Sequence, residues 1–308
     1  MANYITVDGG TTNTRASLVC HNTVLATKKM DIGVGKKDIA ALKNAIKTAI
    51  AELLAENDLA EKEIECILAS GMITSEYGLC NLPHLTAPAG AAELHHAMHK
   101  TTIADVSDIP FVFIRGVKKN GDDLDGTDMM RGEETELMGM LQGDRQGCLY
   151  VLPGSHSKHI TVSDCGSIVD LRTMLTGELL AAVMGHTILR DAADLGSDID
   201  ETALKSGFAY AQKRGINEAL FKTRILKTLF NATKSQCYGF LLGCVLCDEV
   251  TSILQASEQT VILGGQKQLR TAMALLLKKY SDKTVVMLSD TQVAHSTALG
   301  AVRIYECC

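Results

Sequence analysis

The first part of the chain changes from the hydrophobic period of strands to that of a helix. Residues 4–8, 14–20 and 23–29 are short β-rich runs separated by glycine- and asparagine-containing turns, which predicts a three-stranded antiparallel meander. Apolar residues then recur every three or four positions across residues 38–56, which predicts an amphipathic helix. An apolar run at residues 65–70 is typical of a strand in a covered sheet.

The same order of elements returns in the second half of the chain. A further apolar run at residues 111–115 and a short helix at 130–141 lead into it. The predicted elements that follow are strands at 148–152, 158–163 and 167–172, helices from 176 to 256, a strand at 260–263, a helix at 266–280, a strand at 284–288 and a closing helix at 291–305. A meander followed by alternating helices and strands therefore occurs twice.

This repeated order predicts an α/β chain of two similar lobes facing a central cleft. The length of 308 residues, about twice that of a usual single domain, favours two lobes as well. Residues 118–128 form a polar segment rich in glycine and aspartate, so we place the boundary there. We expect an N-terminal lobe over 1–120 and a C-terminal lobe over 121–308, and the closing helix over 291–307 could pack back on the first lobe.

Composition and charge exclude several classes of protein. Hydrophobic residues make up 46% of the chain and charged residues 21%, which is ordinary for a globular protein with a core. The formal net charge of −6 argues against non-specific nucleic-acid binding, which needs a basic surface. Tryptophan is absent and aromatic residues total 4%, so platforms on which bases could stack are not expected either.

The cysteines and the apolar stretches indicate a compartment. Ten cysteines show no paired framework, which is the pattern of reduced cytosolic thiols. The longest apolar stretches fall short of the roughly 18 residues that a membrane span needs, and no basic segment leads into an apolar run at the N-terminus. We therefore expect a cytoplasmic protein without a membrane partner.

Two groups of potential metal ligands have simpler explanations. Cys244 and Cys247 lie in an apolar helical stretch without a second pair at zinc spacing, which predicts buried thiols. His95, His96 and His99 are predicted to form a solvated helix face.

The turn after the first strand could hold a phosphate. Asp8 ends an apolar strand and is followed by Gly9, Gly10, Thr11 and Thr12. Glycines let the backbone approach a phosphate, and backbone N–H groups and threonine hydroxyls can donate to its oxygens. Asp8 is suited to hold Mg²⁺ through water. An ordinary hairpin turn has the same composition, so this segment alone does not decide.

A second turn has related chemistry. Gly154 and Ser155 follow an apolar strand, and Lys158 could meet a phosphate as a point charge. A nucleophilic serine is disfavoured because the G-x-S-x-G elbow is absent. Gly264 and Gly265 close another strand before a helix, where a flat ligand such as adenine could lie against the backbone. Plain turns remain the structural alternative at both places.

Charged residues gather around the start of the helix predicted at 130–141. Asp128, Glu133 and Glu134 supply carboxylates, and Arg131 lies among apolar neighbours. A kinase needs a carboxylate that accepts the proton of the attacking hydroxyl, and it gains from a cation for an anionic substrate. Acidic residues in a first helical turn also simply favour the helix dipole, which is a strong structural alternative.

Taken in order, these segments resemble the 2-dehydro-3-deoxygalactonokinase (2-keto-3-deoxygalactonate kinase) family, within the actin, sugar kinase and Hsp70 superfamily. The blocks that carry the resemblance are VDGGTTNTR at 7–15, ASGMI at 69–73, MRGEET at 130–135, LPGSHSK at 152–158, MLTGEL at 174–179 and ILGG at 262–265. The third and fourth blocks are the most specific to the family. The first and last are shared with the wider superfamily.

The resemblance implies two ribonuclease-H-like lobes with ATP and Mg²⁺ between them. It implies transfer of the γ-phosphoryl group to the 6-hydroxyl of a 2-keto-3-deoxy sugar acid, namely 2-dehydro-3-deoxy-D-galactonate of galactonate catabolism. By motif position it assigns the metal to Asp8, the first phosphate loop to Gly10, Thr11 and Thr12, the second to Gly154, Ser155 and Lys158, and the adenosine contact to Gly264 and Gly265.

The resemblance leaves parts of the site open. It points to Glu133 as the base, with Glu134 and Asp128 as rivals. Its candidates for the substrate end are Arg15, Gly71, Met72, Thr74 and Arg131. The family usually has tryptophan where Gly9 stands and an aromatic residue at His159, which puts the exact sugar acid in doubt more than the reaction.

Two alternative functions remain at this stage. One is a kinase for another sugar acid or a hexose, and the other is a non-catalytic sensor of sugars or nucleotides with the same fold. The sequence does not fix the oligomeric state and is compatible with a homodimer.

Overall fold

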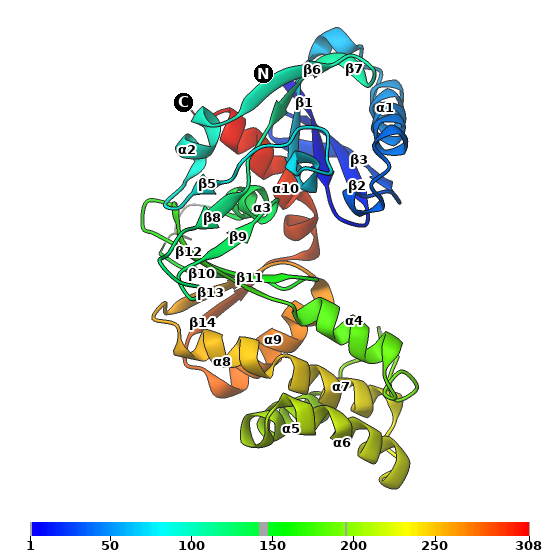
Figure 1. The fold of residues 1–308 in the computed structure, drawn as a ribbon, viewed down its shortest axis with the longest axis vertical. Helices are drawn as coiled ribbons and strands as arrows, with labels where there is room; N and C mark the ends of the chain where they lie inside the picture. Colours follow the sequence, from blue (N-terminus) through cyan, green and yellow to red (C-terminus); the bar gives the residue numbers. More distant parts are fainter. Residues whose placement is uncertain (1, 142–146, 195, 308) are drawn as a thin grey trace. The chain divides into compact units, whose positions relative to one another are not determined.

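The computed structural model describes residues 2–141, 147–194 and 196–307 (Figure 1). By its contacts the chain divides into two compact units. The first consists of Met1–Gly147, Thr161–Leu171 and Ser289–Cys308, and the second of Cys148–Ile160 and Arg172–Leu288. The lobe boundaries expected from the sequence, 1–120 and 121–308, rest on the repeated order of elements and stay a prediction.

The first unit contains a mixed six-stranded sheet. Its strand order is β3-β2-β1-β4-β7-β6, with bounds Thr23–Met30, Thr14–Cys20, Asn3–Gly9, Ile64–Gly71, Ser107–Phe113 and His99–Ile103. Strand β1 is antiparallel to β2 and parallel to β4. The predicted meander is confirmed, and the carboxyl ends of β1 and β4 lie at the same edge of the sheet because these strands run in the same direction.

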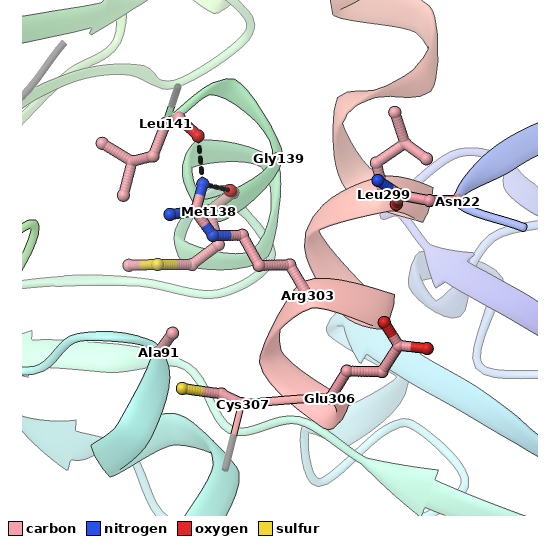
Figure 2. A pocket seen from close by; sticks show the side chains of 9 residues that line it. All are labelled: Asn22, Ala91, Met138, Gly139, Leu141, Leu299, Arg303, Glu306 and Cys307. Atoms are coloured by element: carbon pink, nitrogen blue, oxygen red, sulfur yellow. Dashed lines mark hydrogen bonds between the residues drawn. The ribbon is translucent and has the colours of Figure 1, made fainter. Parts of the chain in front are cut away.

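Helices complete the first unit. Helix α1 (Ile39–Glu56) is capped at its N-terminus by Asp38, whose side chain accepts a hydrogen bond from the Ala41 amide, and the helix buries the predicted apolar face. Helix α10 (Asp290–Tyr305) packs against α3 (Glu133–Met140) and also contacts β1 and β4. The Arg303 guanidinium of α10 donates to the last carbonyls of α3, those of Met138 and Leu141 (Figure 2).

Four short elements of the first unit differ from the prediction, namely α3 and the three strands of a small sheet. The helix predicted from residue 130 begins at Glu133, because Met130 pairs with Val117 in a small sheet. That sheet has the order β5-β8-β9, with bounds Leu85–Thr86, Val117–Lys119 and Asp128–Met130, so strands flank the predicted loop at 118–128.

The histidines do not form one helix face. His95 and His96 lie in α2 (Ala91–His96), and His99 begins strand β6. The prediction of a single solvated helix face is therefore wrong for His99. Strand β6 has the sequence HKTTI, and its polar residues hide the strand from a search for apolar runs.

The second sheet has the order β12-β11-β10-β13-β14. The bounds are Ile168–Met174, Ser157–Val162, Leu149–Leu152, Thr260–Leu263 and Thr284–Met287. Strands β10, β13 and β14 are parallel, as expected for strands joined by helices, and β10 and β13 are largely buried whereas β14 at the edge of the sheet is partly exposed. Residues of β11 and β12 fall in both units, and the other strands belong to the second.

Helices supply most of the core of the second unit. They are α4 (Thr176–His186), α5 (Glu201–Arg214), α6 (Ile216–Leu229), α7 (Lys234–Val245), α8 (Cys247–Gln255) and α9 (Lys267–Tyr280). Cys244 and Cys247 are buried, as predicted, and burial raises the pKa of the Cys244 thiol to about 12. Among the described helices none alone has the length and apolarity to cross a membrane, whereas α7 and α8, bent by 48°, meet that test only as a pair.

Candidate functional site

Asp8 lies at the carboxyl end of β1, beside the ends of β2 and β4. Its register partners are Arg15 on β2 and Ser70 on β4. The Arg15 guanidinium is 3.0 Å from the Asp8 carboxylate, and their side chains are 48% and 23% exposed. Burial raises the pKa of the Asp8 carboxyl, and the neighbouring Arg15 opposes this shift. The structure therefore joins two predicted site residues into one charged pair.

The loop after Asp8 is held by its backbone. The Gly10 amide donates to the Asn13 carbonyl at 2.9 Å, and the amides of Val34 and Gly35 donate to the carbonyls of Gly10 and Thr11. The side chain of Thr11 is exposed, as is that of Thr12. A fixed backbone with exposed hydroxyls is the arrangement that an oxyanion-binding turn needs.

Two glycines bring the start of α3 against this edge of the sheet. Gly71, at the end of β4, has φ +82°, and Gly132, just before α3, has φ +114°. A Cβ atom on Gly132 would lie 3.1 Å from the Gly71 Cα, and one on Gly71 would lie 2.7 Å from the Gly9 carbonyl oxygen. Both positions exclude ordinary side chains. The carboxylates of α3 are thereby placed near the ends of β1 and β4.

Glu134 has a mainly internal role in this geometry. Its side chain is fully buried, and its carboxyl accepts two hydrogen bonds from the Gly132 amide, at 2.8 and 3.0 Å, and one from the Thr135 hydroxyl at 3.0 Å. Burial, and then the charge of Glu133, raise the pKa of Glu134 to about 8. The Glu134 carboxyl therefore caps the N-terminus of its own helix, α3.

Glu133 and Asp128 are more open. The Glu133 carboxylate accepts a hydrogen bond of 3.0 Å from the Arg131 amide, and the residue is only partly buried. Asp128 lies in β9, opposite Lys119, and its carboxylate accepts from the Met129 amide at 2.6 Å. The structure thus brings Glu133 to the start of α3 and leaves Asp128 on a neighbouring strand.

Glu136 is a candidate site residue that the sequence did not point to. Burial raises the pKa of its carboxyl to about 8, the charges of Glu133 and Asp8 act in the same direction, and Arg15 opposes them. Glu136 follows Glu133 by three positions, so both project from one side of the helix. The signal was present as the E-x-x-E spacing that continues the block at 130–135.

Arg131 finds its partners inside the first unit. Its guanidinium donates to the carbonyl and hydroxyl oxygens of Thr74, both at 2.6 Å, and to the Leu82 carbonyl at 3.2 Å. It also lies 3.2 Å from His84 Nδ1. Burial, and then Arg131, lower the pKa of His84 to about 4, so a neutral ring can accept this hydrogen bond. Arg131 therefore fastens residues 71–84, which include Met72 in the short helix Met72–Thr74.

In the second unit, the turn after β10 is tied to the start of α4. The amides of Gly177 and Glu178 donate to the carbonyls of Gly154 and Ser155 at 3.0 and 3.2 Å. Ser155 is exposed. Lys158 is 5% exposed, and its ammonium group donates to the Thr173 hydroxyl at 2.9 Å.

A pocket of about 210 Å³ lies beside this turn. Its lining is Ser155, Gly177, Leu180, Ala181, Tyr238, Gln266, Gln268 and Leu269. The predicted adenosine segment leads into it, because Gly264 and Gly265 immediately precede Gln266. The structure thus brings Ser155 and the start of α9, which follows Gly264 and Gly265, to one pocket. Tyr238, Gln266 and Gln268 were not predicted, since four separate segments form the lining.

A larger cavity of about 560 Å³ lies in the first unit (Figure 2). It is lined by residues at the C-terminal end of α3 together with Arg303, whose guanidinium faces Met138 and Leu141. Eight helical residues span about 12 Å, so this cavity lies at the other end of α3 from Glu133. It does not belong to the candidate site.

The described residues contain no cluster of three or more His, Cys, Asp or Glu side chains that could hold a metal ion. Mg²⁺ commonly uses one or two carboxylates and completes its shell with water and substrate phosphates. A single carboxylate at Asp8, beside a turn rich in N–H groups and hydroxyls, fits that mode of binding.

Comparison with known proteins agrees with this arrangement. Residues 8–300 match the family model described as 2-keto-3-deoxy-galactonokinase. The chain is 30% identical over 261 residues to the 2-dehydro-3-deoxygalactonokinase of Escherichia coli strain K12, which covers 82% of this chain and 80% of that one.

Solved structures show the fold. A crystal structure from Sinorhizobium meliloti, described as that of a putative 2-dehydro-3-deoxygalactonokinase protein, has a TM-score of 0.79 at 24% identity and covers 98% of this chain and 99% of its own. The activator of 2-hydroxyisocaproyl-CoA dehydratase from Clostridium difficile, solved with bound ADPNP, has a TM-score of 0.53 at 10% identity and covers 98% and 93%.

The α/β actin-like ATPase fold predicted from the sequence is confirmed by these likenesses. The resemblance read from the motif blocks is confirmed by a match that spans nearly the whole chain. This chain belongs to the 2-keto-3-deoxy-galactonokinase family.

Proposed function

We propose that this chain transfers the γ-phosphoryl group of ATP to the 6-hydroxyl of 2-dehydro-3-deoxy-D-galactonate. The main support for this proposal is the family match over residues 8–300. In this chain the Asp8–Arg15 ion pair also lies near the carboxylates of α3. The curated relative from E. coli bears the name of this activity, and the C. difficile neighbour was solved with an ATP analogue.

We assign the metal and first phosphate contacts to the end of β1. Asp8 would hold Mg²⁺, which supplies charge neutralisation on the transferred phosphoryl group. The fixed turn at Gly10, Thr11 and Thr12 would donate N–H and hydroxyl hydrogen bonds to phosphate oxygens. Arg15 keeps Asp8 in place through their 3.0 Å contact.

We assign the base to Glu133. Its carboxylate lies at the start of α3, is partly exposed and faces the charges of Glu134 and Glu136. A carboxylate there could accept the proton of the sugar hydroxyl as the phosphoryl group is transferred. Glu134 supports this role by capping the helix. Asp128, on β9, is the weaker candidate.

We assign the substrate end to Arg15 and the segment that contains Gly71, Met72 and Thr74. Half of the Arg15 side chain is exposed, so its guanidinium could also meet the carboxylate of a sugar acid. Arg131 contributes by holding Thr74 in place rather than through a free guanidinium, because its hydrogen bonds go to Thr74, Leu82 and His84.

We assign nucleotide binding in the second unit to the turn at Gly154 and Ser155, to Lys158, and to Gly264 and Gly265. Support comes from the pocket of about 210 Å³, which Ser155 lines together with Gln266. Its amide and phenol side chains offer hydrogen-bond partners to a base, and its apolar lining offers contact to the ring faces.

The test is an ADP-release assay with purified protein across a panel of 2-keto-3-deoxy sugar acids, other aldonates and hexoses. The proposal predicts the highest kcat/KM with 2-dehydro-3-deoxy-D-galactonate. A higher value with another acid or a hexose would replace the substrate, and ATP binding without any product across the panel would favour a sensor. A cytoplasmic location and a homodimer stay predictions.

A further inference from the structure

Three buried polar side chains near the Gly154–Ser155 turn have no role in the proposed reaction. They are His159, Thr176 and Glu249, which are 4%, 5% and 1% exposed. His159 Nε2 lies 3.2 Å from one Glu249 carboxylate oxygen, and the Thr176 hydroxyl donates to the other. One buried carboxylate therefore joins a histidine and a threonine from distant parts of the chain.

Each of the three residues belongs to a different element. His159 is on β11, next to Lys158; Thr176 is the first residue of α4; Glu249 is in the first turn of α8. A carboxylate in the first turn of a helix is favoured by the helix dipole. Glu249 thus contacts both strand β11 and the first residue of α4 from the start of α8, where the helix dipole stabilises its charge.

The start of α4 in turn holds the Gly154–Ser155 turn by hydrogen bonds. The amides of Gly177 and Glu178 donate to the carbonyls of Gly154 and Ser155. The approach is close, since a Cβ atom on Gly177 would lie 2.4 Å from the Gly154 carbonyl oxygen. A shift in the first turn of α4 would therefore move this loop.

Stability alone does not account for this arrangement. A buried ionic or polar group is costly to desolvate, and well-packed apolar residues often give equal or greater stability. His159 follows Lys158 and Thr176 precedes Gly177 in the chain, and Gly177 and Ser155 line the same pocket. We therefore expect the three hydrogen-bonded side chains to orient the Gly154–Ser155 turn.

We propose that Glu249 is a positioning residue, which through Thr176 and His159 sets the orientation of the Gly154–Ser155 turn for nucleotide phosphates. This inference rests on the proposed function, in which that turn binds ATP. It predicts that damage to the Glu249 contacts weakens ATP binding and leaves the affinity for the sugar acid unchanged.

The experiment compares Thr176→Val with Thr176→Ser. Valine matches the shape of threonine without the hydroxyl, and serine retains the hydroxyl. The Kd for ATP is measured directly by calorimetry, and KM for each substrate is measured in the ADP-release assay. A turn that has lost its fixed orientation must be re-oriented when ATP binds, and a cost of about 1.4 kcal/mol for this step predicts a rise of about tenfold in the ATP Kd of T176V. Serine should restore most of the affinity, and KM for the sugar acid should stay within about twofold in both variants.

Val250→Ala is the matched control for a loss of packing. Val250 follows Glu249 on α8, is fully buried and makes none of these hydrogen bonds. Its truncation should lower Tm through a cavity while the ATP Kd stays unchanged. If T176V does not fold, Glu249→Gln, which keeps the volume and one acceptor oxygen, should still raise the ATP Kd several-fold.

Three results would overturn the inference: wild-type ATP affinity in T176V, wild-type affinity in E249Q where that variant replaces it, or an equal loss of affinity in V250A. A wild-type protein that binds ATP but phosphorylates no sugar acid would refute the proposed function alone, because the Kd comparison still holds. A wild-type protein that binds no ATP would refute both.

Discussion

Replacement of Glu134 by glutamine tests the division of roles among the carboxylates of α3. Glu134 is fully buried and accepts hydrogen bonds from the Gly132 amide and the Thr135 hydroxyl. Glutamine has the shape of the protonated carboxyl and keeps an oxygen for these donors. Glu134→Gln should therefore fold normally, with kcat within about tenfold of wild type, because the residue does not act as the base.

The same substitution has a pH-dependent effect whose sign follows from the pKa of Glu134. Folding raises this pKa from 4.5 to about 8. Between these values the folded protein keeps a proton that the unfolded chain has released, so the free energy of unfolding falls as pH rises through this window. At 1.36 kcal/mol per pH unit, the loss attributable to Glu134 is roughly 3–5 kcal/mol and is complete above pH 8.

Urea unfolding of both proteins at pH values from 5 to 9 measures this effect. As pH rises across this range, the difference in unfolding free energy, E134Q minus wild type, should increase by roughly 3–5 kcal/mol. Glu133→Gln is the control, since loss of its charge should lower the Glu134 pKa and shift the upper end of the window to lower pH. Parallel stability curves for wild type and E134Q would refute the reasoning.

The remaining predictions concern three other residues of the first unit. Asp8→Asn should abolish phosphoryl transfer while circular dichroism shows a folded protein, and near-normal turnover would refute the metal role of Asp8. Glu133→Gln should lower kcat by about 10²–10⁴-fold in the ADP-release assay, and a larger loss in Glu136→Gln would move the base to that residue. Arg131→Lys, which cannot reach Thr74, Leu82 and His84 together, should destabilise the protein by about 2–4 kcal/mol in urea unfolding, and an unchanged midpoint would contradict its structural role.

Much of the fold could be predicted because apolar residues recur at regular spacings in its main helices and strands. Helix α1 has both an apolar stripe and a capping Asp38, β10 and β13 are short runs of mainly apolar residues, and β1 is rich in residues that favour strands. Short elements were harder, because β8 and β9 have only three residues each and are defined by each other. The start of α3 depends on the left-handed backbone at Gly132, which a period does not reveal.

The candidate site could be predicted where one segment carries it. Asp8 and its turn are contiguous, so the motif shows in one stretch the residues that the structure places together at the end of β1. Glu136 and Tyr238 were missed because their importance comes from neighbours on other elements, namely Asp8 in one case and Gln268 in the other. Arg131 stays a predicted residue of the substrate end, and the sequence does not show that its guanidinium donates to the carbonyls of Thr74 and Leu82.

The central claim, that this chain is a sugar-acid kinase, is tested most directly by the product itself. Purified protein is incubated with ATP, Mg²⁺ and 2-dehydro-3-deoxy-D-galactonate, and the mixture is followed by phosphorus NMR with proton correlation. The account predicts ADP together with an equal amount of one phosphomonoester whose phosphorus couples to the protons on carbon 6. ATP that stays intact, or that yields only ADP and inorganic phosphate, would contradict it.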